Sequence, residues 1–109
     1  MVATFEVLAD ESRRRILDVL VEEERPVGEL AEILTLSQPS VSKHLKVLRD
    51  AGLVEARTDA QRRIYRVRPE PLREIDEWLA PYRRRWAESL SALERHLEIM
   101  DGTEEETWT

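Results

Sequence analysis

The chain has 109 residues, a formal net charge of −6 at pH 7 and no cysteine. This length allows one domain with a modest core, and the lack of cysteine excludes disulfides, thiolate metal sites and thiol redox chemistry. Because the start lacks a basic segment followed by an apolar run, and no apolar stretch approaches about eighteen residues, we expect a cytoplasmic protein with no membrane partner.

The first part of the chain predicts two helices. Residues 2–8 form a short helix with one apolar face, made of Val2, Phe5 and Leu8. Asp10 then stands where an N-cap is expected, before a second helix over Glu11–Val21. The apolar side chains expected to face inward from the second helix are Ile16, Leu17, Leu20 and Val21.

Three consecutive arginines, Arg13, Arg14 and Arg15, lie in the first turns of the second helix. We expect a solvated face on which these arginines pair with the neighbouring carboxylates Asp10, Glu11 and Asp18. A phosphate contact from one of them is the alternative. Residues 22–25 then form a charged connector that ends at Pro26.

The next segment predicts two short helices joined by a tight turn. Residues 26–34 carry an apolar pattern made of Leu30, Ile33 and Leu34, and only residues 35–37 separate it from the second helix. In that helix Ser37 can cap the first free amides, and Pro39 is tolerated in the first turn. Gly52 supplies a left-handed stop after it.

The second of these helices has two contrasting faces. Its apolar stripe consists of Val41, Leu45 and Leu48, at helical spacing. Its outer face combines small hydroxyls with cations, namely Ser40, Ser42, Lys43 and Lys46. Such a face can approach the major groove of DNA closely. We call this predicted element the reading helix.

A basic hairpin follows the reading helix. Residues 53–58 and 63–68 alternate as two strands, and residues 59–62 are polar enough to turn. Helix, turn, helix and hairpin, in this order, are typical of a winged helix-turn-helix. The predicted fold is therefore mainly α with a small β-hairpin, the wing.

The charge is unevenly distributed along the chain. The window from Ser37 to Arg68 carries a formal charge of +5, whereas the remainder carries −11. An acidic average argues against nucleic acid as a partner, but a local basic patch can neutralise phosphates. The sequence therefore predicts double-stranded DNA as a partner, bound with strong salt sensitivity.

Residues 69–71 mark a boundary, and a long final helix follows. Its apolar seam averages 3.5 residues per step and consists of Leu72, Ile75, Leu79, Tyr82, Trp86, Leu90, Leu93, Leu97 and Met100. Pro81 is expected to kink or split this helix. Because the seam is long for so small a body, we expect it to join a second copy of the chain. Residues 1–100 would form the domain and 101–109 a disordered acidic tail.

Several separated motifs resemble one known family. They are LADESRRRIL (residues 8–17), LAE (30–32), SQPSVSKHLKVL (37–48) and AGLV (51–54). In this order they resemble the ArsR family of bacterial winged-helix repressors, over most of residues 5–97. The resemblance implies a homodimer joined by its first and last helices, and transcriptional repression that an effector relieves.

The resemblance also implies site residues. On the reading helix these are Gln38, Ser40, Ser42, Lys43 and His44, and on the wing Arg62, Arg63 and Tyr65. Together with the charge pattern, the full set expected to contact DNA is Ser37, Gln38, Ser40, Ser42, Lys43, His44, Lys46, Arg57, Arg62, Arg63 and Tyr65. The set expected at the dimer interface is Val2, Phe5, Leu8, Leu79, Tyr82, Trp86, Leu90, Leu93 and Leu97.

Two departures from the family bear on metals and on the wing. Metal sensors of this family carry a Cys-x-Cys pair where this chain has residues 28–32, without a sulfur ligand. The last helix has a single histidine, His96, so we expect no metal cofactor. Carboxylates such as Asp76, Glu77 and Glu88 would suit only a weak site for hard cations. The wing tip, residues 59–62, also lacks the glycine that many relatives have.

Residues 78–86 resemble a subgroup without metal sites, in which the regulator often represses its own operon. Trp78, Tyr82 and Trp86 are spaced by four residues; they would form interface core or, alternatively, a pocket for an apolar effector, whose identity the sequence leaves unknown.

Two other functions compete with DNA binding. An enzyme is disfavoured because the chain has no cysteine, no glycine-rich phosphate loop and no nucleophile elbow. The other rival is a winged-helix module that binds another protein. Such a module has no need of the cations that cluster around small hydroxyls here.

Overall fold

The structure, a computed structural model, describes residues 2–99. The predicted acidic tail and the seam residue Met100 lie outside the described residues, as does the side chain of the expected interface residue Val2. The chain divides into two compact units, a body that extends to Ile75 and a second unit that begins at Asp76.

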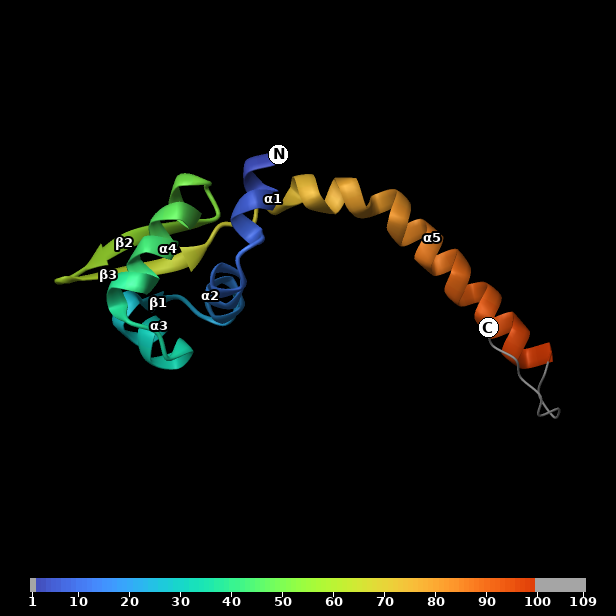
Figure 1. The fold of residues 1–109 in the computed structure, drawn as a ribbon, viewed down its shortest axis with the longest axis horizontal. Coiled ribbons are helices and arrows are strands. Elements are labelled where there is room, and N and C mark those ends of the chain that lie inside the picture. Colours follow the sequence, from blue (N-terminus) through green and yellow to red (C-terminus); the bar gives the residue numbers. More distant parts are fainter. Residues whose placement is uncertain (1, 100–109) are drawn as a thin grey trace. The chain divides into compact units, whose positions relative to one another are not determined.

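The described residues form a mainly helical fold with one small sheet (Figure 1). In chain order the elements are α1 (Val2–Leu8), α2 (Glu11–Glu22), β1 (Arg25–Pro26), α3 (Val27–Leu34), α4 (Gln38–Asp50), β2 (Val54–Asp59), β3 (Arg62–Val67) and α5 (Leu72–Ile99). This is the order expected of a winged helix-turn-helix, so the predicted fold is confirmed.

The core of the body lies where the apolar stripes of the helices meet the start of the hairpin. Its fully buried side chains are Ile16, Leu30, Val41, Leu45, Leu48, Leu53 and Val54. Val21, predicted to face inward, is 67% exposed, and Ile33, part of the apolar pattern over residues 26–34, is 47% exposed. On α3 the buried face includes Ala31 instead, since a small side chain allows close packing.

Side chains at the α1–α2 junction explain why α2 begins where it does. The Asp10 carboxylate accepts a hydrogen bond of 3.1 Å from the backbone N–H of Arg13, which confirms the N-cap. Among the described residues no carboxylate oxygen lies within 4.0 Å of a side-chain nitrogen of the three consecutive arginines, although the charge of Arg13 still acts on Asp10. Arg13 donates to the carbonyl of Val7 at 2.8 Å and Arg14 to that of Leu8 at 2.7 Å, which satisfies the free end of α1.

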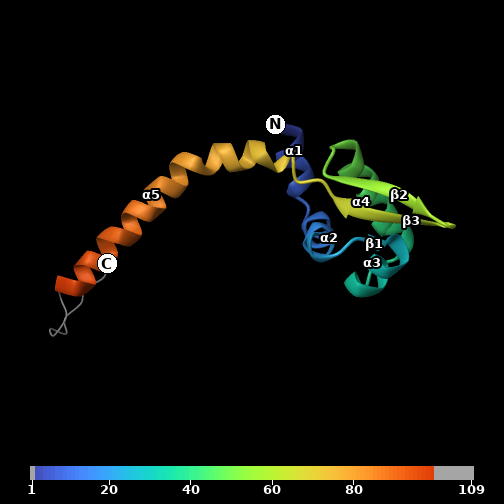
Figure 2. The ribbon, with the colours of Figure 1, turned by 180° about the vertical axis from the view of Figure 1, so that it is seen from behind.

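The sheet has three antiparallel strands in the order β1-β3-β2. Strand β1, which consists only of Arg25 and Pro26, was not predicted, because two residues have no periodicity and Pro26 reads as a helix start. Strands β2 and β3 lie side by side, and their turn projects beyond the helices in both views (Figures 1 and 2). This projecting hairpin is the predicted wing.

Helix α5 begins in the body, where Leu72 packs against the core, and continues as the second unit. It remains one helical element across Pro81, so the predicted split does not occur. Within the second unit the rings of Trp78 and Tyr82 lie 4.9 Å apart, tilted by 41°. No residue of α5 is fully buried in the single chain.

Candidate nucleic-acid interface

Helix α4 is the predicted reading helix, and its two ends are fixed by local contacts. The Ser37 hydroxyl accepts a hydrogen bond of 3.2 Å from the backbone N–H of Ser40, which confirms the cap. At the other end Gly52 adopts a left-handed φ of 78°, and the N–H of Leu53 donates to the Leu48 carbonyl at 2.9 Å. Backbone groups at both ends of α4 are therefore hydrogen-bonded without using side chains of its outer face.

The packing of α4 decides which side chains remain free. Val41, Leu45 and Leu48 are fully buried, so the opposite face is turned to solvent. On that face Gln38, Ser42, Lys43 and Lys46 are exposed. No carboxylate within the described residues lies within 4.0 Å of the Lys43 ammonium, whereas Lys46 pairs with Asp50 at 3.2 Å. That exposed pair is weak and leaves Lys46 available to phosphate.

The register of the wing assigns its side chains to two faces. Residues paired across an antiparallel ladder share a face, and successive residues alternate. Ala56 pairs with Tyr65 and Thr58 with Arg63, so these four residues share one face. Tyr65 and Val67 pack on the core, which shows that this face turns toward the helices. The Arg63 guanidinium lies over the Tyr65 ring, 5.8 Å from its centroid.

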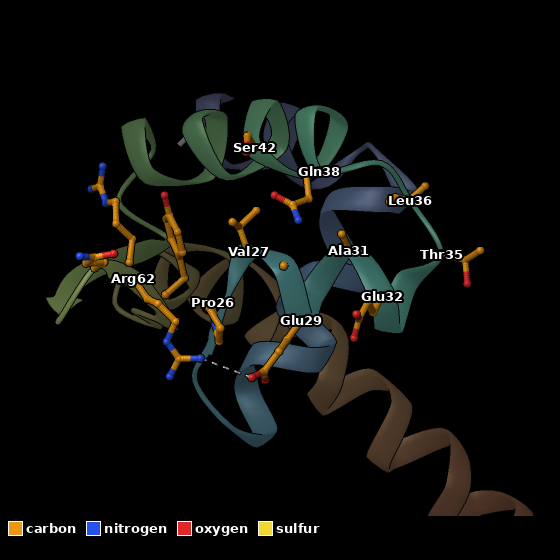
Figure 3. Close-up of a pocket in the computed structure, with 14 residues that line it drawn as sticks. Pro26, Val27, Glu29, Ala31, Glu32, Thr35, Leu36, Gln38, Ser42 and Arg62 are labelled. Atoms are coloured by element: carbon orange, nitrogen blue, oxygen red, sulfur yellow. Dashed lines mark ion pairs between the residues drawn. The ribbon is translucent and has the colours of Figure 1, made fainter.

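A groove of about 1050 Å³ joins the reading helix to the wing (Figure 3). Gln38 and Ser42 line it from α4, and Arg62, Arg63 and Tyr65 line it from the wing. Five residues of the predicted DNA-contacting set thus meet on one surface. Gly28 at the start of α3 also lines the groove and faces Gln38: a Cβ there would lie 3.5 Å from the amide nitrogen of Gln38, at van der Waals contact.

His44 lies on a different flank of α4. Its side chain is half-buried, and its charge acts on Asp10, the cap of α2. The hydrogen bond from Arg13 is the main reason that the pKa of Asp10 lies below its usual value; partial desolvation opposes it, and the nearby His44 charge lowers the pKa further. His44 therefore lies close enough to the N-cap of α2 for its charge to act on Asp10.

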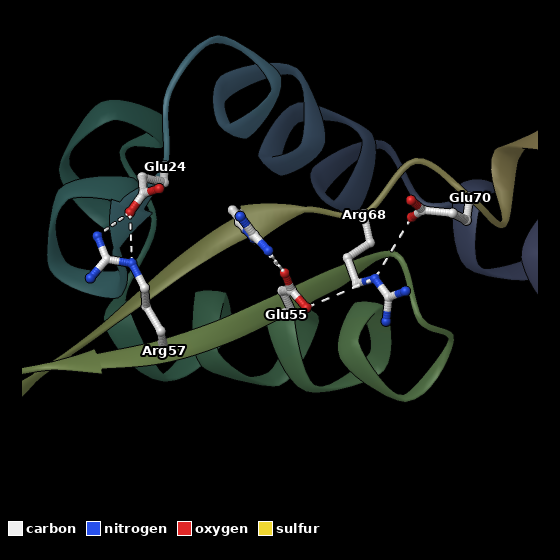
Figure 4. A network of polar contacts seen from close by, with 6 residues as sticks. Glu24, Glu55, Arg57, Arg68 and Glu70 are labelled. Atoms are coloured by element: carbon white, nitrogen blue, oxygen red, sulfur yellow. Dashed lines mark hydrogen bonds and ion pairs between the residues drawn. The ribbon is translucent and has the colours of Figure 1, made fainter.

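Arg57 is a predicted contact residue that already has an acidic partner within the chain. It points to the sheet face opposite Tyr65, and Glu24 binds its guanidinium through two nitrogens, one of them at 3.0 Å (Figure 4). On the same side of the hairpin Glu55 pairs with Arg66. The charge of Arg57 is therefore already compensated in the single chain, and we expect this residue to contribute less to DNA binding than the cations that line the groove.

The remaining cation of that side extends the network. Arg68 lies 3.9 Å from a Glu55 oxygen and 3.7 Å from a Glu70 oxygen (Figure 4). Three arginines that contributed to the charge of the basic window are thus matched by acids. Within the window from Ser37 to Arg68, the cations without a carboxylate within 4.0 Å among the described residues are Lys43 and Arg49 on the reading helix and Arg63 on the wing face beside it.

Two contacts made by α3 could not be anticipated from the sequence. Glu29, in the first turn of α3, lies 4.0 Å from Arg62 of the wing. Arg15 of α2 donates to the Leu34 carbonyl at the end of α3, at 3.3 Å. Both contacts join segments far apart in the chain, and no local pattern signals them.

The expected dimer surface is largely exposed in the single chain. Leu90, Leu93 and Leu97 are 60%, 38% and 51% exposed, and Tyr82 and Trp86 are also exposed. Leu79 is half-buried. In the body, Phe5 is 36% exposed, whereas Leu8 packs against the core of its own chain.

Within residues 2–99, no group of three or more histidine, aspartate or glutamate side chains is arranged to hold a metal ion. None of the described helices is both long and apolar enough to cross a membrane.

Comparison with known proteins gives consistent matches. The profile described as "Bacterial regulatory protein, arsR family" matches residues 10–56. The chain is 38% identical to the arsenic resistance transcriptional regulator ArsR1 of Pseudomonas putida in an alignment of length 96, which covers 77% of this chain and 75% of that protein. It is 46% identical to the HTH-type transcriptional regulator Rv2034 of Mycobacterium tuberculosis over 68 residues, 62% of this chain and 64% of that protein.

A solved structure agrees with the sequence relatives. Reduced HlyU from Vibrio cholerae superposes with a TM-score of 0.61 at 38% identity, over 74% of this chain and 86% of that one. The chain thus spans between about two thirds and three quarters of the length of the two sequence relatives. Both relatives are named as transcriptional regulators, and neither as an enzyme.

Proposed function

This chain belongs to the arsR family of bacterial regulatory proteins, and we propose that it is a DNA-binding transcriptional repressor. It would act as a homodimer on an inverted-repeat operator, in the cytoplasm where bacterial DNA lies, and would repress its own gene. The observation that carries the proposal is the surface on which the exposed polar face of α4 and the wing arginines border one groove.

The chemistry of this surface supports separate roles for its residues. Gln38 and Ser42 carry hydrogen-bonding groups that can reach base edges when α4 enters the major groove. Lys43, Arg62 and Arg63 are exposed cations suited to phosphates. Tyr65 supports Arg63 from below and so orients its charge. Ser37, Ser40, His44 and Lys46 complete the proposed contact surface.

The dimer is proposed from the apolar stripe of the second unit. Leu90, Leu93 and Leu97 recur at steps of three and four and are exposed to water in the single chain. Burying such a stripe against a second copy removes the unfavourable free energy of exposing its leucines to water. A two-fold axis between the copies then presents two reading helices to two half-sites. The matching half-sites would lie about one helical turn apart.

A second candidate is an effector-responsive regulator. The paired rings of Trp78 and Tyr82, each about half exposed, would give an apolar molecule a flat surface near the dimer axis. We regard these rings first as interface core, since aromatic side chains at helical spacing serve that purpose without a ligand.

A reporter experiment tests the direction of regulation. The DNA immediately upstream of the gene is placed before a reporter, and this protein is supplied from a second, inducible promoter. Repression predicts that reporter output falls when the protein is induced and that Lys43→Ala restores it. An increase in output would make the protein an activator, and an unchanged output would remove autoregulation.

A further inference from the structure

Glu29 brings a negative charge into the groove that the proposed function turns toward DNA. It lies in the first turn of α3 and lines the groove beside Arg62 of the wing (Figure 3). One carboxylate oxygen lies 3.3 Å from a terminal nitrogen of Arg25, and the other lies 4.0 Å from a terminal nitrogen of Arg62.

Arg25 holds this carboxylate in place. Its side chain is only 27% exposed, and its second terminal nitrogen lies 3.3 Å from Glu23. An arginine held by two acids in this way is a rigid support, because its planar guanidinium fixes both directions at once. The Glu29 oxygen that faces the wing is therefore presented toward Arg62.

The two adjacent wing arginines differ in what surrounds them. Among the described residues no carboxylate lies within 4.0 Å of Arg63, which is stacked over Tyr65. Arg62 has Glu29 as an ion-pair partner, yet its side chain remains 59% exposed. Arg62 can therefore turn either to Glu29 or to a DNA phosphate, whereas no carboxylate of the described residues competes with a phosphate for Arg63.

We propose that Glu29 competes with DNA phosphates for Arg62 and thereby weakens sequence-independent binding. The inference rests on the proposed function. Sequence-independent affinity comes almost entirely from phosphate contacts, so a competing acid at one of them lowers it directly. Base readout by Gln38 uses hydrogen bonds that Arg62 does not supply, so Glu29 lowers the phosphate-dependent affinity and leaves the sequence preference to the base contacts.

Glu32 offers a matched control on the same helix. It lines the same groove and is exposed, but no cation of the described residues pairs with it. Glu29→Gln and Glu32→Gln change the net charge equally and so change the long-range attraction to DNA by similar amounts. A difference between the two variants isolates the contact with Arg62.

The test measures binding of the full chain to a labelled duplex of random sequence by fluorescence anisotropy, over a series of KCl concentrations. We expect Glu29→Gln to tighten binding about two- to fivefold per subunit beyond the effect of Glu32→Gln. Its salt dependence should be steeper by up to about 0.9 units of slope per subunit. In an Arg62→Ala background the extra gain should vanish.

Further variants keep the outcomes distinct. Glu29→Asp keeps the charge but shortens the side chain away from Arg62, so it should tighten binding as well; it also serves if Glu29→Gln fails to fold. Equal effects of Glu29→Gln and Glu32→Gln, or a gain that persists without Arg62, would overturn the inference. Loss of all DNA binding by the unmodified chain would instead overturn the proposed function.

Discussion

A terminal nitrogen of Arg15 lies 3.3 Å from the carbonyl oxygen of Leu34, so a side chain of α2 satisfies the last residue of α3. The next residue, Thr35, adopts a left-handed φ of 57°. A β-branched residue is strained in that region, because its branched side chain crowds the backbone. The turn that sets α4 relative to α3 therefore combines a cationic support with local strain.

Replacement of Thr35 by glycine should stabilise the protein. Glycine adopts a positive φ without a steric penalty, and the relief exceeds its greater loss of chain entropy. We expect an increase in the free energy of unfolding of up to about 1 kcal/mol, measured by urea denaturation. Thr35→Ala is the control, since it removes the side chain but retains a Cβ; an equal gain there would show that φ is not the cause.

Asp10 should make stability depend on pH at the acid end. Its pKa is lowered in the folded protein, chiefly by the hydrogen bond from Arg13, so its contribution is complete above the usual aspartate range and is lost as the pH falls through the folded value. Asp10→Asn keeps a capping acceptor without a titrating group. The gap in melting temperature between the two proteins should therefore shrink below about pH 4; a gap that widens there would contradict the assignment.

The apolar stripe of α5 should hold the dimer together. Replacing Leu90 and Leu93 by glutamate would bury unpaired charges, each at a cost of several kcal/mol by order of magnitude. Light scattering should then report a monomer or an aggregate. Ser91→Glu with Ala92→Glu adds the same charge beside the stripe and should leave the dimer intact. A stable dimer after both leucine changes would move the interface elsewhere.

Arg57 and Arg63 should differ sharply although both are wing arginines. Arg57 is bound by Glu24 on the far face, whereas Arg63 stands over Tyr65 beside the groove. Arg63→Ala should weaken binding to every duplex and reduce the salt slope by about 0.9 units per subunit. Arg57→Ala should change affinity less than about twofold, within the range of an exposed pair. Equal losses would show that Arg57 contributes to binding as much as Arg63.

The elements of the body could be predicted because their signals are local. Ser37, Val41 and Leu45 already mark the cap and buried stripe of α4, and the hairpin alternates with period two. The end signal is equally local, since Gly52 does adopt the left-handed conformation expected of it. Caps, periodicity and turn residues were therefore sufficient for the helices and the hairpin, whereas the two-residue strand β1 carries no such signal.

The errors lie where a residue's role depends on distant partners. Ile33 has the helical spacing of a core residue, but nothing packs over it to bury it fully. Arg57 contributes to a basic window, yet Glu24 neutralises it from 33 residues away. A charge count along the chain cannot tell which face of the wing a cation occupies. The contact between Glu29 and Arg62 could not be predicted for the same reason, because it joins residues that are far apart in the chain.

The most direct test of the account is the affinity ratio for two duplexes, one carrying the inverted repeat upstream of the gene and one with the same bases scrambled. At physiological salt, we predict a preference of at least about 10³-fold for the repeat. Gln38→Ala should reduce this preference by about fivefold or more per subunit, whereas Lys43→Ala should weaken both duplexes alike. Equal affinity of the unmodified chain for the two duplexes would contradict the claim that this surface reads DNA sequence.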